Sequence, residues 1–262
     1  MNRVEPKVFL IAHTQLDEEG VTAWLRHVGG LKVLDHIDGD DGEALVELAG
    51  RNCYRSFDVG LNPNISKVRT DSEKYHANIL ESAHGSVMEH PTISFAFEDV
   101  SRVFTHEIVR HRAGMAFSQV SLRYVRLDDL RFWIPDIIAD NPEAMAVFED
   151  VIQKCEWGQK ELARIYGIEE MKDFHQKKQL TSAFRRIAPI GVATGIATTF
   201  NLRALRWVIQ MRTAASAEVE IRKVFCEVYE IAKEKYPFLF QDFEKISTDD
   251  GLYECRPSHN KV

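Results

Sequence analysis

The run Ile190–Phe200 constrains the fold of this 262-residue chain more than any other segment. It consists of small, apolar and threonine residues without a charge, which predicts a buried strand or a tightly packed, pore-like segment. A helical pattern over Met171–Ile187 precedes the run and ends at Pro189. Asn201 follows it and can cap a second helix that reaches Arg212. The chain is therefore expected to bury this strand or packed segment between helical segments.

The remaining strand patterns are few and do not alternate regularly with the helical ones. Strands are predicted over Lys7–Thr14, Thr92–Phe97 and Val120–Leu127. Helices are predicted over Glu43–Tyr54, from Asp71 or Ser72 to Ala83, from Ser101 to near Arg112, from Asn141 to Tyr166, and over Ala217–Tyr236, with a loop over 55–70 and an irregular tail after Lys245. This order predicts an α+β fold with mixed helices around a small, mainly antiparallel sheet, in one domain spanning 1–262.

Neither a membrane segment nor a secretory segment is indicated. No apolar run reaches the roughly 18 residues that a membrane helix needs, and Val8–Ala12 is too short for a signal-peptide core. The cysteines are scattered and form no C-x-x-C pair, which argues against a disulfide scaffold and a zinc ribbon. They are Cys53, Cys155, Cys226 and Cys255. We expect a cytoplasmic protein.

The net charge of −7 argues against polymeric nucleic acid as the main partner. The charge is uneven, however. Windows 102–126 and 185–222 hold 11 of the 19 arginines, no lysine and three acids, so together they carry +8. Arginine grips phosphate and carboxylate in a bidentate manner. This pattern favours a cationic pocket for a small anionic ligand over a solvated basic face.

The densest cationic feature is Arg110-His111-Arg112, at the expected end of a helix. Three consecutive side chains point in different directions and could surround a ligand with several phosphates. On the strand expected after it, Ser121 and Arg123 share a face, which suits a phosphate monoester. The alternative is a helix-end cluster paired with acids elsewhere in the chain.

The second arginine-rich region opens a helix with Asn201 and Arg203, and a helix N-terminus favours phosphate. Arg212 closes the same helix, where a simple interaction with the helix dipole is the alternative role. Trp207 lies four residues after Arg203. We expect its indole in the core rather than on a stacking surface for a flat ring.

Motifs for other chemistries are absent or incomplete. His106 and His111 miss the H-E-x-x-H spacing by one residue, and His84, Glu89 and His90 match no common metal site. We therefore predict no metal, and keep a metal-dependent hydrolase that uses His84, Glu89, His90 and His106 as an alternative. Dinucleotide, P-loop and G-x-S-x-G motifs are missing as well, and no cysteine is clearly activated. Such a chain leaves the difficult step to a bound cofactor.

The R-H-R triplet followed by Ser-Gln-Val-Ser-Leu-Arg-Tyr resembles the signature of flavin-dependent thymidylate synthases. His84–His90 is similar to the H-G-x…E-H segment of that family. Asn201–Arg212 with Ala217–Arg222 is similar to its N-x-R…R…A-x-x-E-I block. The segments occur in family order and span about Cys53 to Phe243.

Two features depart from the family pattern. Eight residues rather than seven separate Arg112 from Ser121, which lengthens the loop by one residue. Trp207 stands where relatives often carry Asn or His facing the flavin.

The resemblance implies that dUMP and 5,10-methylenetetrahydrofolate give dTMP and tetrahydrofolate, with NADPH as reductant and FAD as cofactor, in a homotetramer with sites shared between copies. The residues implied to hold FAD are Ser86, Arg110, His111, Arg112, Gln119, Asn201 and Arg203. Those implied to contact dUMP are Glu107, Arg110, Gln119, Ser121, Leu122, Arg123, Arg186 and Arg212. Arg212 is the implied catalytic group, which activates the uracil ring, while Ser121 is assigned to phosphate because no base is evidently placed to activate it. Methylation of another pyrimidine nucleotide such as UMP, and a non-catalytic nucleotide-binding protein, are the alternatives.

Overall fold

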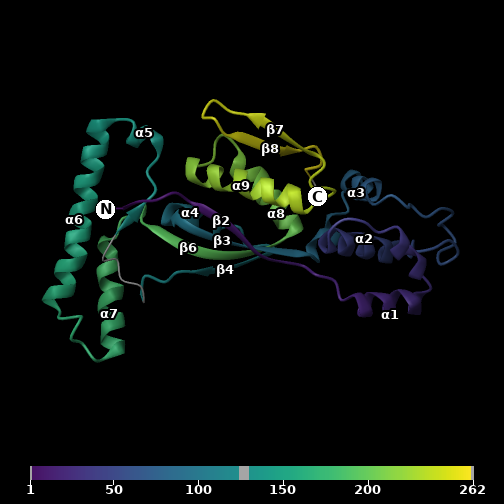
Figure 1. Ribbon diagram of the computed structural model, residues 1–262, viewed down its shortest axis with the longest axis horizontal. Coiled ribbons are helices and arrows are strands. Elements are labelled where there is room, and N and C mark those ends of the chain that lie inside the picture. The colour runs from purple at the N-terminus through teal and green to yellow at the C-terminus, as the bar shows by residue number, and fades with distance from the viewer. Residues whose placement is uncertain (1, 124–129, 261–262) are drawn as a thin grey trace. The chain divides into compact units, whose positions relative to one another are not determined.

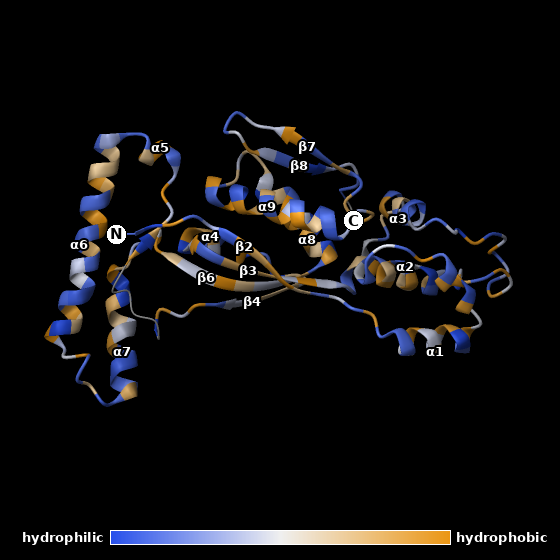
Figure 2. Cartoon of the chain, in the orientation of Figure 1, coloured by the Kyte–Doolittle hydropathy of each residue, from blue (hydrophilic) through white to orange (hydrophobic). Residues whose placement is uncertain are grey.

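The main sheet has four strands in the order β2–β3–β6–β4 (Figure 1). They are β2 (Lys7–His13), β3 (Thr92–Ser101), β4 (Met115–Gln119) and β6 (Ala193–Asn201). The computed structural model describes residues 2–123 and 130–260. Hydrophobic residues run along β3 and β6 (Figure 2), and most residues of β6 are buried. The buried strand predicted within Ile190–Phe200 is confirmed, and β6 is an inner strand because β3 and β4 flank it.

The chain divides into two compact units. Unit 1 contains the chain up to Phe9, Ala96–His111 and Phe117–Thr198. Unit 2 contains Leu10–Phe95, Arg112–Ala116 and the chain from Thr199 onward. The α+β class is confirmed, whereas one domain over 1–262 stays a prediction.

Unit 1 is dominated by two helices, α6 (Pro142–Ile165) and α7 (Phe174–Phe184), which lie side by side (Figure 1). Asn141 begins α6 as predicted, because its Oδ1 accepts hydrogen bonds from two backbone N–H groups of the first turn, with Pro142 at the start. Gln159 Nε2 donates to the Phe184 carbonyl at 2.9 Å and joins the two helices. The other elements of this unit are β1 (Asn2–Arg3), α4 (Arg102–Ile108), β5 (Arg131–Phe132), α5 (Asp136–Ala139) and the 3-10 helix η3 (Arg185–Ile187). Within residues 2–123 and 130–260, no helix has both the length and the apolar character needed to cross a membrane.

Unit 2 contains helices α8 (Leu202–Thr213) and α9 (Val219–Lys235), with a hairpin of β7 (Phe243–Ser247) and β8 (Tyr253–Pro257) packed against them (Figure 1). Arg206 is buried in α8, and its guanidinium donates to both Asp242 carboxylate oxygens at 2.8 and 3.0 Å. This pair fixes the chain just before the hairpin. The other elements are α1 (Glu18–Val28), the 3-10 helices η1 (Leu31–Asp35) and η2 (Gly85–Glu89), α2 (Asp41–Tyr54) and α3 (Ser72–Glu81).

The prediction of an irregular tail after Lys245 is wrong. The antiparallel pairing of β7 with β8 runs from Phe243 opposite Pro257 to Ser247 opposite Tyr253. Buried Cys255 also donates its backbone N–H to Thr213 Oγ1 on α8 at 2.8 Å. Contacts with residues distant in the sequence therefore order this segment. Its own residues show only a weak strand pattern, which is why the prediction failed.

The strand predicted over Val120–Leu127 is also wrong where the structure describes it. The strand lies earlier, at Met115–Gln119, and Leu122 and Arg123 form a turn. The hydroxyl of Ser121 accepts a hydrogen bond from the Arg123 N–H at 3.3 Å, so a local turn replaces the extended ladder. Ser121 and Arg123 therefore do not share a strand face, and positions 124–127 lie outside the described residues.

Burial of Glu43 predicts a pH-dependent stability. Its carboxylate accepts the backbone N–H groups of Phe238 and Leu239, at 2.7 and 3.2 Å, yet burial raises its pKa from 4.5 to about 7. Between these values the native Glu43 carboxyl holds a proton that the unfolded chain releases, so the contribution of Glu43 to stability falls as pH rises. We expect a fall of about 1.4 kcal/mol per pH unit in this window. The free energy of unfolding, measured with urea from pH 4.5 to 8, should lose this fall in Glu43→Gln. The exposed control Glu19→Gln should keep it. Parallel pH profiles for wild type and Glu43→Gln would contradict the assignment.

Candidate functional site

The R-H-R segment follows a short helix whose two ends are well defined. Ser101 begins α4, because its Oγ accepts the Phe104 N–H at 3.1 Å, as the sequence predicted. The helix ends at Ile108 rather than near Arg112. Arg110 is therefore exposed in a turn, and His111 is half-buried just beyond it. Arg110 and Arg112 are exposed beyond the end of the helix, where their guanidinium groups can face a ligand.

Gly114 lets the loop after Arg112 contact Asn201 within unit 2. The Asn201 N–H donates to the Gly114 carbonyl at 2.8 Å. Gly114 has a φ of +70°, and a Cβ at this position would lie 2.5 Å from Asn201 Nδ2. Glycine is required on both counts. Asn201 also caps α8, because its Oδ1 accepts the Ala204 N–H at 2.8 Å, so its amide NH₂ remains for a ligand.

Arg203 in the first turn of α8 forms an ion pair with Glu89 of η2, at 2.6 Å between Nη1 and Oε1. Helix α8 and η2 pack against one another, so this contact brings the segment of Ser86 to the N-terminus of α8. Glu89 was expected either as a metal ligand or as part of the family-like segment His84–His90. Its pairing with Arg203 was not predictable, because the two residues lie 114 positions apart in the sequence.

Trp207 is not a core residue, contrary to the prediction. Its side chain is 49% exposed, one turn beyond Arg203 on α8. The helix instead buries Leu205, Val208 and Ile209. An exposed indole beside an arginine is a surface on which a flat ring can stack.

Unit 1 contains most of the residues implied to contact dUMP. Gln119, at the end of β4, donates from Nε2 to Thr105 Oγ1 at 2.9 Å, and Thr105 lies on the same helix as Glu107. Leu122 is buried, and Arg123 beside it is exposed. The structure thus links α4 to the end of β4, whereas the contact of each side chain with a nucleotide stays a prediction.

Arg102 and Arg185 are a further cationic pair in unit 1. Burial and the positive charge of Arg185 lower the pKa of Arg102, so the two guanidinium groups lie near one another. Arg186, which the resemblance implies as a dUMP contact, donates from Nη1 to the carbonyl of Ser182 on the preceding helix α7. Arg102 and Arg185 both belong to the arginine-rich windows of the sequence.

Arg212 lies in the last turn of α8 and is half-buried. Nine residues separate it from Arg203, which corresponds to about two and a half helical turns. The two side chains therefore leave α8 in opposite directions. A single copy of this helix does not direct both arginines at one side of one ligand.

The metal alternative has no support from the described chain. Among residues 2–123 and 130–260, no three His, Cys, Asp or Glu side chains form a group that could hold a metal ion. Glu89 pairs with Arg203, and His84 makes an edge-to-face contact with Tyr54, with 5.8 Å between ring centroids.

Known proteins are similar to this chain in sequence. The profile of the thymidylate synthase complementing protein family matches residues 32–238. A flavin-dependent thymidylate synthase of Corynebacterium diphtheriae is 37% identical over 214 residues, which cover 80% of this chain and 82% of the relative. One of Mycolicibacterium vanbaalenii is 36% identical over 250 residues, which cover 94% and 92%.

A solved structure shares the fold. The UMP/dUMP methylase PolB of Streptomyces cacaoi, bound with 5-Br dUMP, superposes with a TM-score of 0.62 at 15% identity, covering 91% of this chain and 95% of that one. The chain belongs to the thymidylate synthase complementing protein family, the enzymes named flavin-dependent thymidylate synthases. The resemblance drawn from the R-H-R motif is confirmed.

Proposed function

We propose that this chain is an FAD-dependent thymidylate synthase of the cytoplasm, which methylates dUMP to dTMP with 5,10-methylenetetrahydrofolate and NADPH. The observation that carries this proposal is the junction in unit 2. There the loop of Arg112, the cap Asn201 and the pair Arg203–Glu89 meet at the N-terminus of α8. The three family motifs contribute one segment each.

The residues of this junction fit the diphosphate of FAD. Arg112 is exposed, Asn201 keeps its amide donors, and Glu89 occupies Nη1 of Arg203, only one of the two terminal nitrogens of that guanidinium. Ser86 lies on η2, which packs against the same helix. Arg110, His111 and Gln119 complete the proposed FAD set. Bound flavin supplies the hydride chemistry for which the chain has no side chain of its own.

The nucleotide is proposed to bind through Glu107, Arg110, Gln119, Ser121, Leu122, Arg123, Arg186 and Arg212. Arg123 and Ser121 hold the phosphate. Arg212 lies against the uracil ring, where a fixed positive charge stabilises the ionised ring and so activates C5. Arg203 and Arg212 leave α8 in opposite directions, so one copy of the helix does not direct both at the same side of a ligand. We therefore propose that each site takes residues from more than one copy, in a homotetramer.

An absorption spectrum of the purified protein tests the proposal. We expect flavin bands that bleach with anaerobic NADPH, followed by dTMP formation once dUMP and methylenetetrahydrofolate are added. Methylation of UMP at equal efficiency would favour the broader pyrimidine specificity. Tight dUMP binding without methylation would indicate a nucleotide-binding protein, and a protein that stays colourless after incubation with FAD would refute the flavoenzyme.

Replacing Arg123 with alanine should weaken dUMP binding roughly ten- to hundredfold, because a hydrogen bond to a charged group is lost. Binding of deoxyuridine, which has no phosphate, should not change. Isothermal titration calorimetry with both ligands measures the difference. Arg131→Ala, which breaks an exposed ion pair with Asp99, is the control. Equal loss for dUMP and deoxyuridine would remove the phosphate role of Arg123.

A further inference from the structure

Thr105 is a buried polar residue beside the segments that are proposed to hold the nucleotide. It lies on α4, two residues before Glu107, and its side chain is 2% exposed. Its hydroxyl hydrogen is already in use, because Oγ1 donates to the Arg102 carbonyl of the same helix at 3.2 Å. A hydroxyl has a single hydrogen, so Thr105 can only accept in its other contact.

That other contact sets the orientation of the Gln119 amide. Thr105 Oγ1 accepts a hydrogen bond from Gln119 Nε2 at 2.9 Å. A side-chain amide has an NH₂ end that only donates and a carbonyl end that only accepts. Because Thr105 has no hydrogen left to donate, an amide turned the other way would set two acceptors against one another. The NH₂ end therefore faces Thr105, and the carbonyl oxygen Oε1 points away from it.

The carbonyl oxygen Oε1 of Gln119 is available to a ligand. Gln119 is half-buried at the end of β4. Within residues 2–123 and 130–260, the bond to Thr105 is the only hydrogen bond of its side chain. A half-buried carbonyl oxygen gains from accepting a further hydrogen bond. Ser121 follows two residues later and Glu107 lies on α4, so this amide joins two segments that are proposed to contact dUMP.

The sugar of dUMP carries a donor that fits this acceptor. The phosphate oxygens and the ring carbonyls of dUMP only accept hydrogen bonds. Its donors are the sugar 3′-hydroxyl and the ring N3–H, and the N3 proton is the one that the ring loses when it ionises against Arg212. The 3′-hydroxyl is therefore the donor that persists through the proposed reaction.

We propose that Thr105 is a positioning residue of the nucleotide site, which holds the Gln119 amide so that Oε1 accepts the sugar 3′-hydroxyl of dUMP. This inference rests on the proposed function, because it takes dUMP as the ligand. Thr105 itself touches no ligand and acts through the direction of one amide. An amide that is already held in its bound orientation loses less conformational freedom when the nucleotide binds.

Isothermal titration calorimetry tests the proposal with dUMP and with 2′,3′-dideoxyuridine 5′-monophosphate, which lacks the 3′-hydroxyl. Thr105→Ala and Thr105→Ser differ by one oxygen atom, and both lack the methyl group. Thr105→Ala should weaken dUMP binding about five- to tenfold, the effect of one hydrogen bond, and leave binding of the dideoxy nucleotide unchanged. Thr105→Ser should bind dUMP as the wild type does. Equal loss for both nucleotides, or equal dUMP binding by the two variants, would overturn the proposal.

A double-mutant cycle shows whether Thr105 acts through the amide. In a Gln119→Ala background, Thr105→Ala should cause no further loss of dUMP binding, because the group that it positions is gone. Additive losses would contradict the proposal. Thr181→Ala is the matched control, because Thr181 is also a buried threonine of unit 1 whose hydroxyl donates to a carbonyl of its own helix, that of Lys177 at 2.9 Å. This variant should bind dUMP as the wild type does.

Failure of this inference and failure of the proposed function give different results. A wild type that binds no dUMP would overturn the proposed function and this inference with it. A wild type that binds dUMP, with unchanged binding in Thr105→Ala, would overturn this inference alone. Urea unfolding of each variant before titration checks that it is folded.

Discussion

Replacing Arg212 with alanine is expected to lower the turnover number for dTMP formation roughly 10²–10³-fold, with the flavin still bound. Arg212 closes α8 and is half-buried, so its charge is less screened than that of a surface arginine. Because guanidinium stays protonated at any working pH, it can stabilise a developing negative charge on the uracil ring. Removing it leaves that charge without a partner in the transition state.

The competing role for Arg212 is a charge at the C-terminus of a helix. Loss of such an interaction costs about 0.3–1 kcal/mol of stability and leaves turnover unchanged. Stopped-flow measurement of dTMP formation, together with urea unfolding, therefore separates the two roles. Arg212→Lys should recover part of the rate, because it keeps the charge without the planar fork. Arg256→Ala, an exposed arginine paired with Glu254 on β8, should behave as wild type. Normal turnover by Arg212→Ala would exclude Arg212 from the mechanism.

The helix starts were predictable because their determinants are local. Asp71, Ser101, Asn141 and Asn201 each accept an N–H of the turn that follows them, and each was readable from a few neighbouring residues. The hairpin of β7 and β8 was missed because its order depends on contacts with α8 and α9. The strand expected over Val120–Leu127 was misplaced, because the Ser121 hydroxyl accepts the Arg123 N–H and so stabilises a turn there.

The candidate site was predictable as a set of segments and not as a set of contacts. The R-H-R and N-x-R motifs indicated segments that the structure brings together, because the Asn201 N–H donates to the Gly114 carbonyl just after the R-H-R triplet. The pairing of Glu89 with Arg203 has no local signal across 114 residues. The exposure of Trp207 depends on which face of α8 the rest of unit 2 covers, and the sequence of the helix does not contain that information.

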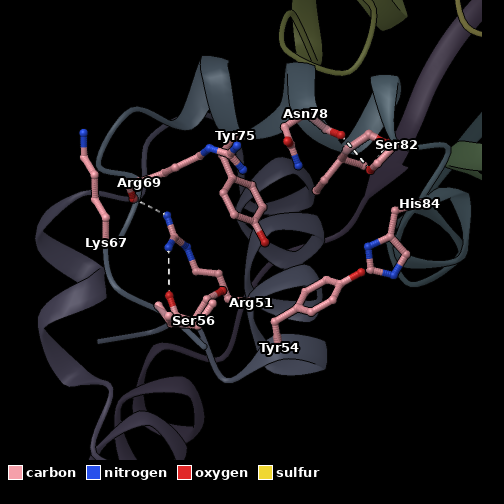
Figure 3. A pocket seen from close by; sticks show the side chains of 11 residues that line it. Arg51, Tyr54, Ser56, Lys67, Arg69, Tyr75, Asn78, Ser82 and His84 are labelled. Atoms are coloured by element: carbon pink, nitrogen blue, oxygen red, sulfur yellow. Dashed lines mark hydrogen bonds between the residues drawn. The ribbon is translucent and has the colours of Figure 1, made fainter. Parts of the chain in front are cut away.

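Arg51 is a buried residue whose contacts were also not predictable from the sequence. It is 1% exposed and joins several parts of unit 2. Its Nε and Nη2 donate to Glu47 Oε1 at 2.9 and 2.5 Å. Its Nη1 and Nη2 also donate to the carbonyls of Ser56 and Arg69, at 3.1 and 2.7 Å (Figure 3). The guanidinium lies 4.5 Å from the ring centre of Tyr75. One buried side chain thus connects α2 to both ends of the following loop.

Glu47→Ala is therefore expected to destabilise the protein by about 3–5 kcal/mol, because it leaves the buried Arg51 guanidinium without a counter-charge. It also removes the shorter of two hydrogen bonds of the Ser72 hydroxyl, which donates to Glu47 Oε2 at 2.6 Å near the start of α3 and to the His36 carbonyl at 3.2 Å. Since total stability is about 5–15 kcal/mol, the midpoint of urea unfolding should fall by a large fraction. The double variant Glu47→Leu/Arg51→Met should recover most of the loss, because both charges are then replaced by apolar groups of similar size. Exposed ion pairs contribute up to about 1 kcal/mol to the free energy of unfolding. A loss below this value for Glu47→Ala would mean that water reaches Arg51 and that the loop over 55–70 does not shield it.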